Sequence, residues 1–215
     1  MNLKKYLAEL IGTFVLVLTV CMITFSKVSA DLQPLAIGAT LMALIYSMGH
    51  ISGAQFNPGV SIGLFLRGKI TLKDTGFYII AQIFGSVLAA FTVQLLISGK
   101  PSVAPFASPP QYFAIGQAVL AELIGAFVLM WVILNVATAK ALEGNSFYGM
   151  AISFTVVGMI YTLGSVSGSV LNPAVALASC ILHLSNWSNL WIYVAGSIGG
   201  VVLATLVYRY IVGEE

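Results

Sequence analysis

Two short stretches decide the fold of this chain, and they read Ser52-Gly53-Ala54-Gln55-Phe56-Asn57-Pro58-Gly59 and Ser167-Gly168-Ser169-Val170-Leu171-Asn172-Pro173-Ala174. Asparagine is a strong helix N-cap, and proline is favoured at the first helical position because its missing N–H needs no partner there. Each stretch therefore predicts a helix that starts sharply at its Asn-Pro pair. The apolar residues around these pairs predict short helices over Phe56–Leu66 and Leu171–Leu182.

Neither of these helices is long enough to cross a membrane. About ten residues at 1.5 Å rise per residue extend about 15 Å, roughly half of the ~30 Å hydrocarbon core. The residues that lead into them, His50–Phe56 and Ser165–Leu171, are rich in Gly and Ser and predict irregular backbone. Such backbone is tolerated at membrane depth only where it is buried or lines a water-filled cavity. The sequence thus predicts two re-entrant half-helices beside a pore or a binding site.

The composition of the whole chain is that of a membrane protein. Of its 215 residues, 59% are hydrophobic and 7% are charged, whereas a soluble domain carries about 25% charged residues. This excludes a soluble enzyme, a nucleic-acid-binding protein and a disordered chain. We predict an all-α membrane protein with six transmembrane helices. The predicted spans are Tyr6–Phe25, Pro34–Met48, Gly76–Ile97, Tyr112–Ala139, Phe147–Leu163 and Trp187–Ile211.

The two halves of the chain repeat each other. The segment Ala8–Leu16 recurs 113 residues later as Ala121–Leu129 with one difference, and the two Asn-Pro pairs lie 115 residues apart. We therefore predict a single channel domain over residues 1–215, built from repeats at about 1–105 and 112–215. Each repeat holds three full spans, an odd number, so the second enters the membrane from the opposite side. Such an inverted repeat places the special site near the midplane, between the halves.

The basic residues predict the orientation in the membrane. With the N-terminus in the cytoplasm, seven of the nine Lys and Arg residues lie on the cytoplasmic side, and only Lys27 and Lys100 lie outside. This is the positive-inside pattern, and it makes both termini cytoplasmic. The proline-rich segment Gly99–Gln111 is expected to form the longest loop. We expect a multi-pass protein of the cell membrane, in a prokaryotic inner membrane because no targeting segment is evident.

The inverted repeat gives the midplane a defined chemistry. The half-helices meet there N-terminus to N-terminus, and each N-terminus carries roughly half a positive charge, which repels cations including hydronium. The side-chain amides of Asn57 and Asn172 can donate hydrogen bonds to passing oxygen atoms. Apolar walls offer an ion no replacement for its hydration shell. The pattern therefore favours a passage for neutral solutes in single file.

On these residues the chain resembles the aquaporin-type channels of the major intrinsic protein family. The likeness covers nearly the whole chain and includes the segment Ala8–Phe14, the pair Ala81-Gln82 and the two Asn-Pro motifs at half-chain spacing. It implies a homotetramer in the lipid bilayer, with a pore in each subunit for water, glycerol-like molecules or other small uncharged solutes. The midplane residues that it implies are Asn57, Pro58, Gly59, Asn172, Pro173 and Ala174.

Two positions depart from the pattern of the family. Gly59 stands where the family usually has Ala, which is a small change in size. Val175 stands where the family usually has Arg, in the outer selectivity constriction. The resemblance places the selectivity filter at Ile37, Ile160, Ser169 and Val175. This filter is apolar and uncharged, and it carries one hydroxyl group.

The consequences of such a filter oppose one another. Loss of the usual Arg and aromatic side chains widens the mouth for larger solutes, whereas an apolar ring impedes water by dewetting. We expect a broad neutral-solute channel that also passes water. One alternative is a channel specialised for uncharged metalloid acids. Another is a secondary transporter, since inverted repeats with broken helices occur in that class too.

Several polar residues of the predicted spans have two interpretations. Glu9 and Glu122 are intramembrane carboxylic acids, which by default indicate function, but their matching places favour a structural role as acceptors for the loop N–H groups. Gln82 is expected to anchor the same loop. His50, at the cytoplasmic mouth, could gate by protonation, although a wall residue is the simpler interpretation. No nucleophile–base pair or metal-ligand cluster is evident, so we expect no enzyme, cofactor or metal.

Overall fold

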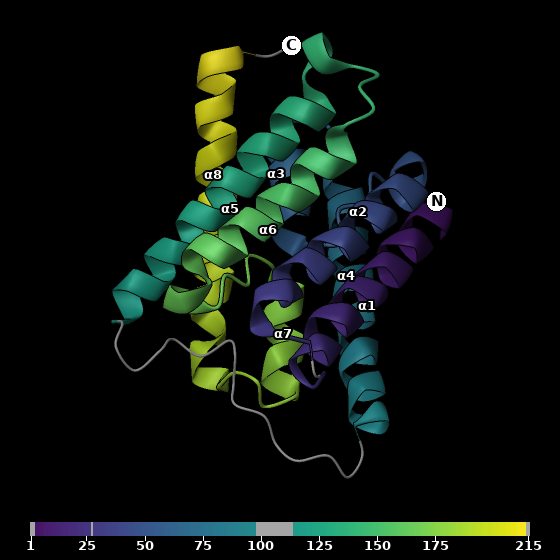
Figure 1. Ribbon diagram of the computed structural model, residues 1–215. Coiled ribbons are helices and arrows are strands. Elements are labelled where there is room, and N and C mark those ends of the chain that lie inside the picture. The colour runs from purple at the N-terminus through teal and green to yellow at the C-terminus, as the bar shows by residue number, and fades with distance from the viewer. Residues whose placement is uncertain (1–2, 27, 98–113, 214–215) are drawn as a thin grey trace.

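The computed structural model describes residues 3–26, 28–97 and 114–213, and every regular element in these ranges is a helix. Six segments are long and apolar enough to cross a membrane, which confirms the predicted all-α membrane fold (Figure 1). Their helices are α1 (Leu3–Thr24), α2 (Gln33–Ser52), α4 (Leu72–Leu96), α5 (Ile115–Thr138), α6 (Tyr148–Ser167) and α8 (Leu190–Val212). Short 3-10 turns are η1 (Ala30–Leu32), η2 (Lys140–Leu142) and η3 (Trp187–Asn189).

Some predicted features lie outside the described residues. They are the loop Gly99–Gln111, the beginning of the fourth span at Tyr112, and the two basic residues Lys27 and Lys100.

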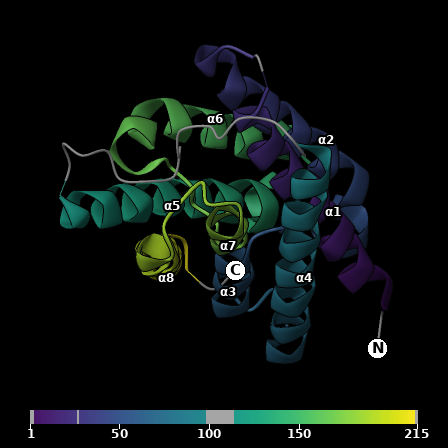
Figure 2. The same ribbon diagram turned by 90° about the horizontal axis from the view of Figure 1, so that it is seen from below.

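Two nine-residue helices, α3 (Pro58–Leu66) and α7 (Pro173–Ile181), lie in the interior of the bundle. Figure 2 shows them in the middle of the molecule, with α8 on one side and α4 on the other. The two helices contact each other, and both pack on α4 and α8. They lie where the sequence predicts half-helices, but each begins at the proline after its asparagine, two residues later than the predicted bounds at Phe56 and Leu171.

The irregular backbone before each short helix is shorter than predicted. Helix α2 continues through His50 to Ser52, and α6 continues to Ser167. Each ends where a glycine, Gly53 or Gly168, adopts a left-handed conformation with φ of 88° or 93°, which glycine adopts at no steric cost. The prediction of irregular backbone from His50 and from Ser165 is therefore wrong. In the structure, irregular backbone is limited to two segments before the asparagines, residues 53–56 and 168–171, which we call the leaders.

Corresponding helices of the two halves pack in corresponding ways. Helix α1 packs on α4, and α5 packs on α8. A Cβ atom on Gly85 would come within 2.5 Å of the Leu10 carbonyl oxygen, and one on Gly200 within 2.2 Å of the Leu123 carbonyl oxygen. Both helix pairs therefore depend on a glycine at their closest approach. The halves meet where α2 packs on α6, and this leaves a space between them beside the leaders.

Candidate pore

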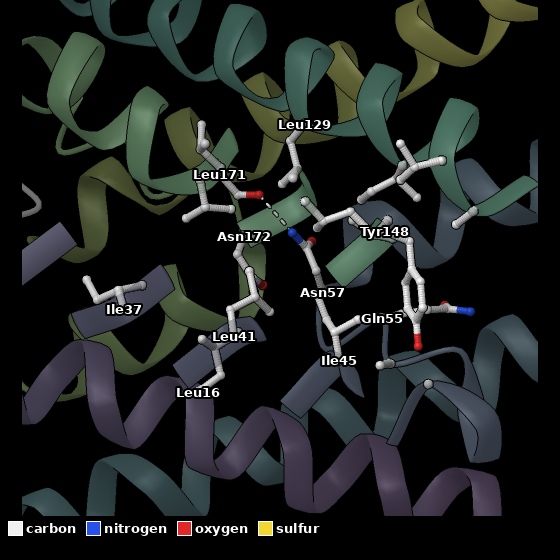
Figure 3. A pocket seen from close by; sticks show the side chains of 18 of the residues that line it. Leu16, Ile37, Leu41, Ile45, Gln55, Asn57, Leu129, Tyr148, Leu171 and Asn172 are labelled. Atoms are coloured by element: carbon white, nitrogen blue, oxygen red, sulfur yellow. Dashed lines mark hydrogen bonds between the residues drawn. The ribbon is translucent and has the colours of Figure 1, made fainter. Parts of the chain in front are cut away.

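A cavity of about 1270 Å³ lies between the two halves. It is lined by α1, α2, α3, α5, α6, α7 and both leaders, and Figure 3 shows part of it from close by. Among its described lining residues, those with a charged or imidazole side chain are exposed at its ends. They are Asp31, His50, Lys69, Lys140 and Glu143. The buried part of the cavity wall is therefore uncharged.

Asn57 and Asn172 cap their helices and also join the two halves. The Oδ1 atom of each accepts a 2.9 Å hydrogen bond from the backbone N–H of the second helical residue, Gly59 or Ala174. The Nδ2 atom of Asn57 donates to the Leu171 carbonyl at 2.9 Å (Figure 3), and that of Asn172 donates to the Phe56 carbonyl at 2.9 Å. Because an amide nitrogen carries two hydrogens, each asparagine keeps one N–H for a solute.

The leaders adopt a strained backbone. Ala54 and Phe56 have φ of 49° and 48°, and Ser169 and Leu171 have φ of 49° and 54°. Residues other than glycine adopt this left-handed region only at a cost of about 1–3 kcal/mol each, and they do so where the surroundings impose it. A buried carboxylate behind each leader imposes it here.

Glu9 holds the first leader from behind. It is fully buried, and its carboxylate accepts hydrogen bonds from the backbone N–H groups of Gln55 and Phe56, at 2.9 and 2.7 Å. The Ser52 hydroxyl donates to it at 2.6 Å, and the Gln82 amide at 2.9 Å. The Gln82 Nε2 atom also donates to the Ser61 hydroxyl at 2.9 Å. This set of bonds ties the leader to α1, α3 and α4.

Glu122 holds the second leader in the same way. Its carboxylate accepts from the N–H groups of Val170 and Leu171 at 2.9 and 2.7 Å, and from the Ser167 hydroxyl at 2.6 Å. The two serines, Ser52 and Ser167, were not among the predicted site residues. A serine directly precedes the glycine in both halves, before Gly53 and before Gly168, and this repeated position is the sequence signal that indicates their role.

The four predicted filter residues all line the cavity, and we call them the Val175 ring: Ile37, Ile160, Ser169 and Val175. Val175 and Ser169 are buried, with 4% and 5% of their surface exposed. The Ser169 Oγ atom has no hydrogen-bond partner among the described residues. It is thus the one side-chain polar group that this ring offers to a solute.

The cavity wall around the asparagines is apolar. It carries leucine and valine side chains from four helices, and the leucines are labelled in Figure 3. They are Leu16, Leu41, Leu129 and Val156. Past Ile45, Figure 3 shows Tyr148 and Gln55, two lining residues that the sequence did not single out. His50 lies exposed in the last turn of α2, at the rim of the cavity.

We expect Asn57→Ala to destabilise the protein. The change removes the cap on α3, a contribution of about 0.5–2 kcal/mol, and it leaves the Leu171 carbonyl without its donor. Thermal unfolding in detergent should therefore occur at a lower temperature. Asn189→Ala is the matched control, because Asn189 stands at the N-cap of α8 without a side-chain cap hydrogen bond. Equal stability of Asn57→Ala and the wild type would contradict the capping role.

Comparison with known proteins identifies the family. The family model described as Major intrinsic protein matches residues 1–208. Aquaporin NIP1-2 of Arabidopsis thaliana is 37% identical, with 97% of this chain and 74% of that protein covered. Aquaporin AqpM of Methanothermobacter marburgensis is 35% identical, with 98% of both chains covered.

A solved structure shares the fold. The aquaglyceroporin from Plasmodium falciparum superposes with a TM-score of 0.84 at 24% identity, over 99% of this chain and 97% of that one. Together with the buried, uncharged cavity between two capped half-helices, these matches establish that the chain belongs to the major intrinsic protein family, a family of passive membrane channels for water and small neutral solutes.

Proposed function

We propose that this chain is a channel of broad selectivity, which passes water and also larger neutral solutes such as urea and glycerol. The observation that carries this proposal is the Val175 ring, whose four side chains include no charge and one unpartnered hydroxyl. Without an arginine or an aromatic ring, more of the cross-section is left for a solute. The proposal involves transport alone and no catalysed reaction.

Two features of the cavity support the exclusion of ions. The N-termini of α3 and α7 meet at its middle, and each contributes roughly half a positive charge. An ion that passes the leucines around them would lose hydration without gaining a replacement shell. A neutral solute loses less, because the free amide N–H groups of Asn57 and Asn172 can bind its oxygen atoms.

The proposal also includes orientation and assembly. The Lys5 ammonium and the Asp74 carboxylate form a 2.7 Å salt bridge that joins the beginnings of α1 and α4, so these two helix ends lie on one side. The basic residues Arg67, Lys69 and Lys73 are on or next to this side, which supports a cytoplasmic N-terminus. We further propose a homotetramer in a prokaryotic inner membrane, as the family resemblance implies.

A series of solutes tests the selectivity. Liposomes that contain the purified protein are mixed with sucrose, urea, glycerol or boric acid at a higher concentration outside than inside. Their volume change is followed by stopped-flow light scattering. We expect faster water, urea and glycerol movement than in protein-free liposomes. Fast water movement with urea and glycerol at the lipid background would overturn the broad-selectivity proposal. If boric acid alone moved faster than in protein-free liposomes, the channel would be one specialised for uncharged metalloid acids and not one of broad selectivity.

A further inference from the structure

The 115-residue repeat pairs each member of the Val175 ring with a residue of the other half. Ile37 corresponds to Ile152, Ile160 to Ile45, Ser169 to Ala54, and Val175 to Val60. The second set, which we call the Val60 ring, is Ile45, Ala54, Val60 and Ile152. Every one of these residues lines the same cavity as the Val175 ring.

Three of the four pairs also match in burial, whereas Ile45 is 3% exposed and its counterpart Ile160 is only partly buried. Val60 and Val175 are each 4% exposed, Ile152 and Ile37 are 8% and 9% exposed, and Ala54 is 7% exposed against 5% for Ser169. Ala54 and Ser169 share the same backbone conformation, with φ of 49° at both. All four residues of the Val60 ring are therefore buried side chains of the cavity wall.

The rings lie on opposite sides of the asparagines. Ile45 is eight positions after Ile37 on α2, which is about 12 Å along the helix axis. Figure 3 shows Ile37, Leu41 and Ile45 in this order along one wall, with Asn172 and Asn57 above them. A solute that crosses the cavity must pass both rings in series.

One difference between the rings has a chemical consequence. The Val175 ring offers the Ser169 hydroxyl, whereas the corresponding Ala54 offers no side-chain polar group. A polar solute beside Ala54 therefore lacks the hydroxyl partner that Ser169 offers in the Val175 ring. The Gln55 amide also lines the cavity, but Figure 3 shows it past Ile45, beyond the ring. For two barriers in series, the less polar one contributes most of the resistance.

We propose that the Val60 ring is a second selectivity filter, and that its lack of a hydroxyl makes it the main barrier to polyols. This inference rests on the proposed function, since it concerns solutes that pass through this cavity. It assigns specificity to Ala54, which lies outside the four filter positions that the family resemblance implies.

Exchanging the hydroxyl between the rings tests this proposal. Wild type, Ala54→Ser, Ser169→Ala and the double variant are compared in glycerol and water permeability. The leader backbone already accommodates serine at the same φ in the other half, so Ala54→Ser is expected to fold. If one hydrogen bond changes the resistance of a ring about 2- to 12-fold, Ala54→Ser raises glycerol permeability about 1.5- to 6-fold. By the same estimate Ser169→Ala lowers it less than about twofold.

The double variant gives the decisive comparison. It moves the hydroxyl from one ring to the other, so two matched filters in series predict the glycerol permeability of the wild type. If the Val175 ring filters alone, Ala54→Ser leaves permeability unchanged and the double variant equals Ser169→Ala, which would overturn the proposal. Water permeability is measured for the same four proteins. A channel that passed only water would overturn the proposed function, but the order of the four water permeabilities would still test the Val60 ring.

Two variants that narrow the rings provide a second test in case the variants with exchanged hydroxyl groups misfold. Ile152→Phe and Ile37→Phe each place an aromatic side chain in one ring, and both are checked for a single peak in gel filtration. We expect both to reduce glycerol permeability more than water permeability. A folded Ile152→Phe protein with wild-type glycerol permeability would contradict a filter at the Val60 ring.

Discussion

Glu122→Leu is expected to prevent formation of a stable channel. The leucine leaves the backbone N–H groups of Val170 and Leu171 and the Ser167 hydroxyl without their acceptor in a buried site. Each unpaired buried group costs about 1–3 kcal/mol, and a folded domain has only about 5–15 kcal/mol of stability in total. The leader, already strained at Ser169 and Leu171, would also lose the contacts that impose its conformation.

The measurement is the yield of monodisperse protein in detergent, followed by water permeability of whatever protein folds. Glu122→Gln should retain part of both, because its amide oxygen still accepts hydrogen bonds. Glu143→Leu is the matched control for yield, since Glu143 is exposed at the end of the cavity and its change should have little effect on folding. Wild-type yield and permeability for Glu122→Leu would show that the carboxylate does not hold the leader.

Val175→Arg is expected to convert the broad channel into a narrow one. The valine is buried in the wall of the cavity, so a long cationic side chain there must project into the passage. We expect glycerol permeability to fall about tenfold or more, and water permeability to fall much less, because water fits beside the guanidinium and accepts its hydrogen bonds.

Val175→Met separates size from charge in this experiment. Methionine fills a similar length without adding a donor or a charge, so it should reduce the permeability of glycerol and water more evenly. Stopped-flow volume change with glycerol and sucrose gradients measures both quantities. If Val175→Arg reduced glycerol and water permeability by the same factor, Val175 would not lie at a constriction.

Much of the fold could be predicted from the sequence because the signals are local. Long apolar runs predict the six spans, and the chemistry of Asn-Pro predicts where α3 and α7 begin. The sequence predicts irregular backbone from His50 and Ser165 because Gly and Ser are frequent there, and so it ends α2 and α6 too early. In the structure only Gly53 and Gly168, with their left-handed φ, end these helices.

The site could be predicted less completely, because its bonds join segments far apart in the chain. The sequence indicates that Asn57 can donate a hydrogen bond, but the acceptor, the Leu171 carbonyl, is 114 residues away. Likewise, Ser52 lies 43 residues from Glu9, and no local pattern connects them. The repeat itself is the one long-range signal in the sequence, and it relates the Val60 ring to the Val175 ring.

The central claim is that this cavity passes neutral solutes passively and excludes protons. Glycerol and proton movement are measured in the same proteoliposomes, by light scattering and by an internal pH dye with the membrane potential clamped. We predict glycerol flux that rises in proportion to its gradient without saturation, together with proton flux equal to that of protein-free liposomes. Glycerol flux that saturates, or that requires a proton or sodium gradient, would contradict a channel and indicate a transporter.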